Sequence, residues 1–115
     1  DYTVFTATDK YIRDNPKVIQ AWTDVVARAE KYVKDTPAAT LTPQIMTFFP
    51  GMDQGAVTEA IERYKQYQIW KTSPLVTAEA MAKLQDMLVA SAVMKETARV
   101  KYEDVVVADF AKKVP

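Results

Sequence analysis

The best candidates for acid–base chemistry in this sequence are two carboxylates, Glu59 and Glu62. They lie three positions apart in a stretch with helical periodicity, so a helix would place them on one side, where two carboxylates can act as general acid and base. Arg63 and Lys65 follow closely and would offset both negative charges. We therefore interpret the pair as part of a solvated helix face.

Motifs that bind ions or phosphates are incomplete. Glu103 and Asp104, joined later by Asp109, could bind a cation together with backbone carbonyl groups, but the ligand pattern of a calcium-binding loop is absent. The Gln54-Gly55 step lacks the glycine spacing and the Gly-Lys-Ser/Thr element of a phosphate loop. We expect no metal, no cofactor and no catalytic residue, and the sequence assigns no ligand-binding residue.

Aromatic and methionine side chains are the other candidates for a binding role. A group of aromatic rings could line a ligand pocket, but the rings fall at helical spacing on apolar faces, so we predict that they belong to the core. Three of the five methionines could form an adaptable surface for a partner, although their spacing also fits ordinary helix packing. The rings are Phe48, Phe49, Tyr64, Tyr67 and Trp70, and the methionines are Met81, Met87 and Met94.

Composition disfavours several classes of function. The 115 residues include no cysteine and no histidine, so a disulfide framework, a thiolate zinc site, a cysteine nucleophile and a histidine-dependent triad are all unavailable. Lys plus Arg number 15 and Asp plus Glu number 15, which gives a net charge of zero. Binding of nucleic acid or an anionic membrane surface requires a clustered positive excess. We expect a protein that is not an enzyme and does not bind nucleic acid.

The elements that must position these residues are mainly helices. Only two glycines occur, and the prolines mark short turns. The β-branched and aromatic opening predicts one short strand over about residues 2–7. A lone strand cannot satisfy its own backbone groups, so it needs a partner sheet, for which residues 105–107 are the only other candidate.

Capping and proline signals divide the first half of the chain. Thr8 caps a short helix that ends by Asp14, and Asn15-Pro16 opens a long amphipathic helix that ends at residues 35–37. Thr42-Pro43 repeats the cap-then-proline signal and predicts a short helix up to Phe49. The apolar stripe of the long helix consists of Val18, Ile19, Trp22, Val25, Val26, Ala29, Tyr32 and Val33.

The second half is predicted to hold two more helices and a tail. One helix runs from about Asp53 to Trp70, and its apolar face consists of Val57, Ala60, Ile61, Tyr64 and Tyr67. Thr77 caps the next, which fades near residues 94–95. Residues 100–113 form an extended tail that runs into a short helix.

The predicted fold is therefore mainly α, with about four to five helices and one short N-terminal strand in a single segment, residues 1–115. No apolar run is long enough to span a membrane, and the first residues do not have the features of a signal peptide. Either the mature protein begins at Asp1 or the chain has been cut from something longer. The wide apolar faces and the orphan strand favour a piece of a larger domain, and the unpaired strand edge also predicts self-association.

The order of elements resembles the C-terminal part of the solute-binding proteins of ABC importers, in the branch that binds nitrate, sulfonates, taurine and thiamine precursors. The likeness starts with the strand, the phrase ATDKYI at residues 7–12, Asn15-Pro16 and the closing KYV at residues 31–33. It continues with FPGM at 49–52, AIERY at 60–64, IW at 69–70 and the ending at 105–111. These motifs cover almost the whole chain.

The resemblance implies a function outside the cytoplasmic membrane of a bacterium. Members of the family have two α/β lobes with the solute in the cleft between them, and this chain would be the last third, mostly helices that pack on the first lobe. Such a protein captures a small organic or anionic solute in the periplasm, or at the extracellular membrane surface, and delivers it to an ABC permease without covalent chemistry. Two alternatives remain: a free-standing helical interaction module, and a small enzyme built on a carboxylate pair.

Overall fold

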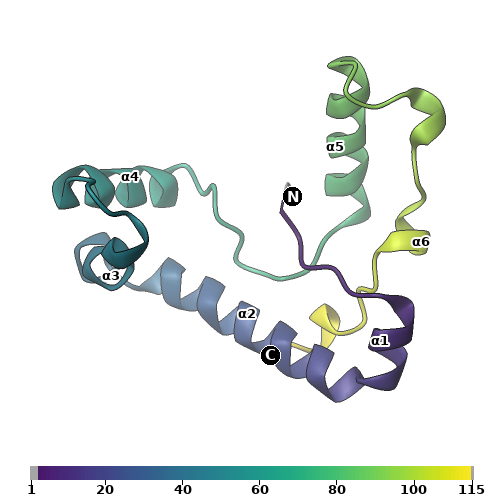
Figure 1. Ribbon diagram of the computed structural model, residues 1–115, viewed down its shortest axis with the longest axis horizontal. Helices are drawn as coiled ribbons and strands as arrows, with labels where there is room; N and C mark the ends of the chain where they lie inside the picture. Colours follow the sequence, from purple (N-terminus) through teal and green to yellow (C-terminus); the bar gives the residue numbers. More distant parts are fainter. Residues whose placement is uncertain (1–2, 115) are drawn as a thin grey trace. The chain divides into compact units, whose positions relative to one another are not determined.

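The computed structural model describes residues 3–114, and it is mainly helical, as the sequence predicts (Figure 1). Over this range the chain forms six α-helices and three 3₁₀ helices, and no strand. The α-helices are α1 (Asp9–Asp14), α2 (Pro16–Asp35), α3 (Ala38–Ile45), α4 (Gln54–Gln66), α5 (Ala78–Ala90) and α6 (Tyr102–Val105). The 3₁₀ helices are η1 (Met46–Phe48), η2 (Glu96–Ala98) and η3 (Ala111–Lys113).

These elements form two compact units. One unit contains the described residues up to Thr23 and those from Leu75 onward, and the other contains Asp24–Pro74. Helix α1, helix α5 and the tail therefore belong to one unit, and α3 and α4 belong to the other. Helix α2 contributes its first turns to one unit and its remaining turns to the other.

The starts of α1 and α2 follow from local capping chemistry. The Thr8 hydroxyl accepts a hydrogen bond from the Tyr11 N–H at 3.2 Å, which confirms Thr8 as the cap of α1. Asn15 joins the two helices: its side-chain amide donates to the Tyr11 carbonyl at 3.2 Å, while its own carbonyl accepts from the Val18 N–H at 3.0 Å. Pro16 then occupies the first position of α2, where its missing N–H costs nothing.

The buried core lies between α3 and α4, which lie side by side (Figure 1). Ala38 and Leu41 of α3 pack with Val57 and Ile61 of α4, and Val33 of α2 contacts the edge of this cluster. Within the cluster Thr42 is completely buried. Its hydroxyl donates to the Ala38 carbonyl at 2.9 Å and accepts from the Thr58 hydroxyl at 2.9 Å.

The predicted start of the third helix is wrong. The helix begins at Ala38, directly after Pro37, so Thr42 and Pro43 lie inside it. Pro43 has no N–H to give to the carbonyl four residues earlier, which weakens the helix locally. Burial of Ala38 and Leu41 against α4 stabilises the additional turn, and the Thr42 hydroxyl bonds back along the helix instead of capping it.

Helix α4 ends about one turn before the predicted end at Trp70, because the chain turns left-handed at Gln68 (φ 52°). The Gln68 N–H donates to the Lys65 carbonyl at 3.1 Å, and the Ile69 N–H donates to the Tyr64 carbonyl at 3.0 Å. This pair of bonds is a Schellman motif, which closes a helix by satisfying its last carbonyls. The start at Asp53 agrees with the prediction, since its carboxylate accepts from the Ala56 N–H at 2.9 Å.

Helix α5 ends in the same way. Ala92 has a φ of 58°, its N–H donates to the Val89 carbonyl at 2.9 Å, and the Val93 N–H donates to the Leu88 carbonyl at 2.9 Å. At its other end the Thr77 hydroxyl accepts from the Ala80 N–H at 3.1 Å, which confirms the predicted cap. Both Schellman motifs thus use a residue other than glycine in the left-handed position.

Polar contacts tie α5 to the segment that follows it. The Gln85 side chain accepts from the Val100 N–H at 2.9 Å and donates to the Val100 carbonyl at 3.2 Å. Arg99 pairs with Asp86 at 2.8 Å and with Glu96 at 2.6 Å. These contacts connect α5 to the tail in a unit whose described residues include none that is fully buried.

The predicted N-terminal strand is not formed. Residues 3–7 adopt neither a strand nor a helix, and Tyr2 lies outside the described residues. The candidate partner at residues 105–107 is no strand either, because Val105 closes α6 and the two residues after it are irregular. The tail holds two short helices, α6 and η3, where one was predicted. With no neighbouring strand, a β-prone sequence cannot complete its backbone hydrogen bonds.

Candidate functional site

The five aromatic residues of the predicted core are exposed. Their relative exposures are 78 % for Phe48, 40 % for Phe49, 43 % for Tyr64, 66 % for Tyr67 and 40 % for Trp70. The prediction that they form the core is therefore wrong. Helical spacing placed them on apolar faces, but the core between α3 and α4 is filled by smaller aliphatic residues. These rings are available for contact with something else.

Two of these rings contact each other. Tyr64 near the end of α4 and Trp70 in the following segment meet edge to face, with centroids 5.5 Å apart and planes at 83°. The Schellman motif at Gln68 reverses the chain and brings Trp70 back against Tyr64. The pair is thus held by the local fold of one helix end.

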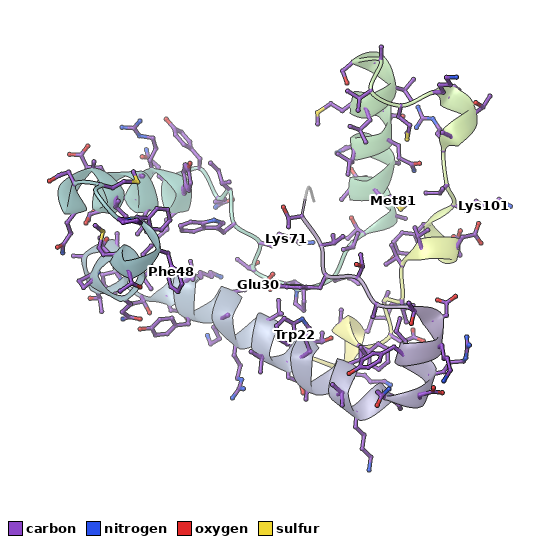
Figure 2. The ribbon with its side chains drawn as sticks, in the orientation of Figure 1. Trp22, Glu30, Phe48, Lys71, Met81 and Lys101 are labelled. Carbon is purple, nitrogen blue, oxygen red and sulfur yellow. The ribbon has the colours of Figure 1, made fainter. Side chains whose placement is uncertain are left out.

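Glu30 is the ionisable group whose surroundings are most unusual. It lies on α2, and Lys71 lies on the segment after α4, next to Trp70 (Figure 2). The Glu30 Oε2 atom is shielded from solvent and accepts no hydrogen bond from the described residues. Burial raises the pKa of Glu30 above its ordinary value of 4.5, and the positive charge of Lys71 partly opposes that shift.

The apolar flank of α2 explains this desolvation. Glu30 follows Val26 by four positions and precedes Val33 by three, so both partly buried valines neighbour it on the helix surface. A carboxylate in this position can accept a proton or a hydrogen bond from a ligand or partner. A single carboxylate beside an ammonium group provides an anion-and-cation pair for recognition.

The other candidate carboxylates are divided between α4 and the tail. Glu59 and Glu62 are exposed on α4, as a solvated face requires. Glu103 and Asp104 lie in the first turn of α6. Asp109 lies beyond that helix, and its Oδ1 atom is 3.9 Å from the Lys112 Nζ atom. Among residues 3–114 no group of three or more potential ligands is placed to hold a metal ion.

The methionines do not form one face of α5. Met81 is partly buried and Met87 is 63 % exposed, while Met94 lies beyond the end of the helix at Ala90. The Schellman motif at Ala92 interrupts the helical spacing before Met94. A continuous methionine surface is therefore absent from this part of the structure.

Sequence reasoning missed Glu30 and Lys71. A usable signal was present for Glu30, because an acidic residue between two valines at helical spacing lies on the border of the apolar stripe. No comparable signal marks Lys71, which approaches Glu30 only through the turn after α4. Proximity of this kind depends on the fold.

The first turns of α2 carry a further uncovered apolar surface. Val18 is 52 % exposed and Trp22 is 50 % exposed, although both belong to the predicted stripe. The only ring that contacts Trp22 among the described residues is Phe5, edge to face at 5.1 Å, and Phe5 is itself 73 % exposed. Figure 2 shows Trp22 on α2.

No protein-family model matches the chain, and neither a curated protein nor a solved structure matches it. Over residues 3–114, the helices are all too short or too polar to cross a membrane. The candidate surfaces are therefore defined separately in each unit: the exposed rings and the desolvated Glu30 lie in Asp24–Pro74, and the uncovered residues Val18 and Trp22 of α2 lie in the other unit.

Proposed function

We propose that the chain is the C-terminal segment of the substrate-binding component of an ABC-type importer. The observation that carries the proposal is the uncovered apolar surface of each unit. Val18 and Trp22 in one unit, and Phe48 and Tyr67 in the other, all expose half or more of their surface. Amphipathic helices owe most of their stability to burial of the apolar face, so these helices lack the partner that would cover them.

The sequence resemblance supplies that partner. In the solute-binding proteins that this chain resembles, the last third of the polypeptide consists mainly of helices that pack on the first lobe. A short helix, the Asn15-Pro16 junction and a long helix that ends before Pro37 occur here in the same order. The missing first lobe accounts for the exposed surfaces without any need for a nucleic acid or a lipid partner.

The role is binding and transport, not catalysis. The whole protein captures a small organic or anionic solute, such as a sulfonate, nitrate or a thiamine precursor, in the periplasm or at the extracellular membrane surface. It then delivers the solute to the ABC permease. The chain has neither cysteine nor histidine, so it offers no thiol or imidazole nucleophile, which supports a role without covalent chemistry.

The test uses the native gene product from its source. We expect its intact mass to exceed that of this chain severalfold, and its reading frame to begin with an export signal. Thermal unfolding with taurine, an alkyl sulfonate, nitrate or a thiamine-precursor pyrimidine should then identify the solute. A ligand at a hundred times its Kd stabilises the folded protein by about 2.7 kcal/mol. The isolated 115-residue chain is the control and should show no shift.

Two results would count against the proposal. A native product no longer than this chain would overturn it and favour a free-standing helical interaction module. A longer product that none of these solutes stabilises would overturn the solute class.

A further inference from the structure

Helix α5 ends at a point where the local sequence favours its continuation. Ala92 has a φ of 58°, a left-handed conformation that is costly for alanine because its Cβ approaches the following carbonyl oxygen. No glycine or proline occurs between Leu75 and Val114. Residues 91–99 read SAVMKETAR, and most of these residues favour helices. Contacts with another segment, and not the local sequence, therefore set this end of α5.

The segment that makes these contacts is the strap, residues 96–102, which folds back along α5 (Figure 1). The Gln85 side chain accepts from the Val100 N–H at 2.9 Å and donates to the Val100 carbonyl at 3.2 Å. Arg99 pairs with Asp86 at 2.8 Å. Neighbouring residues of α5 thus bind neighbouring residues of the strap.

The strap lies along the partly buried side of α5. Gln85, which binds it, is itself partly buried. Three partly buried apolar residues at spacings of three and four share this side: Met81, Leu84 and Leu88. At the end of the strap the Tyr102 hydroxyl donates to the Val76 carbonyl, just before α5, at 2.8 Å. The strap therefore follows α5 from its last turns back to its start.

Water reaches most of the contacts that hold the strap. The side chains of Asp86 and Arg99 are 67 % and 30 % exposed, and Val100 is 48 % exposed. Ion pairs in such surroundings contribute little to stability. They oppose the backbone strain at Ala92 and the helix propensity of residues 91–99. Neither arrangement of this segment has a large advantage over the other.

We propose that residues 91–102 form a conformational switch with two states. In the docked state, which the structure describes, Ala92 is left-handed and the strap lies on α5. In the extended state α5 continues through Ala92 to about Arg99. A helix rises about 1.5 Å per residue, so Arg99 would then lie about 20 Å from Asp86 along the helix axis. The two states therefore exclude each other.

The switch controls which side chains of α5 are accessible. In the extended state the strap no longer lies beside Met81, Leu84 and Leu88, and the Tyr102 hydroxyl loses the Val76 carbonyl. The apolar side of α5 is then uncovered, and the helix is longer by about two turns. All of these residues belong to one unit, so the inference does not depend on the proposed function.

Detachment of the strap without extension of α5 fits the chain less well. A detached, irregular segment would lose the bonds from Gln85 and Asp86 and form no others in exchange. Extension of α5 instead gives the backbone groups of residues 91–99 helical partners and relieves the strain at Ala92.

NMR relaxation dispersion on the isotope-labelled native product, whatever its length, tests the proposal. In the wild type we expect residues 91–98 to exchange on the microsecond-to-millisecond timescale with a minor state whose Cα chemical shifts are helical. Gln85→Met removes both bonds to Val100 and leaves helix propensity nearly unchanged. It should raise the population of the helical state on the order of tenfold and weaken the NOEs between residue 85 and Val100.

Two further variants separate extension of α5 from a general loss of structure. Lys83→Met is the matched control: it introduces the same residue on α5, at an exposed side chain that pairs with Glu79 at 2.7 Å. It should change the helical population by less than about twofold. Ala92→Gly, added to Gln85→Met, should reduce that population roughly tenfold, because glycine adopts the left-handed conformation without strain and disfavours the helix.

Two results would overturn the proposal. One is a minor state with random-coil Cα shifts at residues 91–98, which would mean that the strap detaches without extending α5. The other is flat dispersion in the wild type together with no rise of the helical population in Gln85→Met. Should Gln85→Met fail to fold, the wild-type profiles alone decide, and flat profiles then overturn the proposal.

Discussion

Substitution of Ala92 by glycine should stabilise α5. Ala92 has a φ of 58°, in the left-handed region that alanine adopts at a cost of roughly 1–2 kcal/mol. Glycine removes that strain but loses about 0.5–1 kcal/mol through the greater freedom of the unfolded chain. The difference predicts a net gain in stability of about 0.5–1 kcal/mol for Ala92→Gly.

Ala90→Gly is the matched control. Ala90 lies two positions before Ala92 and is the last residue of α5, so its backbone is still helical. The same chemical change there brings only the entropic loss, so we expect destabilisation of about 0.5–1 kcal/mol. The two variants should therefore move in opposite directions and differ by about 1–2 kcal/mol.

Amide exchange measured by NMR is the appropriate assay, because it reports the opening of α5 itself. The Ala92 and Val93 N–H groups donate to the Val89 and Leu88 carbonyls, each at 2.9 Å, and both should exchange roughly 2- to 5-fold more slowly in Ala92→Gly. If both variants speed exchange equally, Ala92 is not held in a left-handed conformation, and the Schellman motif at this helix end is wrong.

Two further predictions concern the unit formed by Asp24–Pro74. Ile61→Ala should lower the free energy of unfolding by about 2–3 kcal/mol in urea titrations followed by circular dichroism, because Ile61 is only 4 % exposed. The control Ile69→Ala deletes the same atoms at a residue that is 57 % exposed, and it should lower the free energy of unfolding by less than about 0.5 kcal/mol. Equal losses of stability in the two variants would contradict the packing of α3 on α4. Burial raises the pKa of the Glu30 carboxyl above 4.5, so the folded state binds the carboxyl proton more tightly than the unfolded chain does. As the pH rises through that raised pKa, the wild-type protein should therefore lose stability relative to Glu30→Gln. Urea midpoints of both proteins from about pH 4 to about pH 7 measure this loss, and a difference that does not change with pH would count against a desolvated carboxylate.

Local signals in the sequence determined the helices wherever capping and proline coincided. Thr8, Asn15-Pro16, Asp53 and Thr77 all lie at helix ends, because each acts through neighbours within one turn. The signal failed at Thr42-Pro43, where burial against α4 outweighs the local preference. It also failed at Gln68, since a left-handed residue that is not glycine leaves no mark in the sequence.

The misplaced features all depend on contacts between distant residues. Whether residues 3–7 form a strand is decided by a neighbouring strand, which the described chain does not contain. Periodicity placed Trp70 on an apolar face, but it could not reveal that smaller residues fill the core. The proximity of Lys71 to Glu30 likewise arises from a turn that brings two segments together.

The two tryptophans are distributed one to each unit: Trp22 contacts Phe5, and Trp70 contacts Tyr64. Indole emission depends on the polarity around the ring, so replacement of either tryptophan by phenylalanine leaves a fluorophore that reports on one unit alone. Trp70 has an additional property. Its ring centroid lies 5.5 Å from that of Tyr64, so excitation energy absorbed by the tyrosine is transferred efficiently to the indole. Loss of that transfer would mark the opening of the turn after α4, so the chain carries its own unlabelled optical probe for each unit.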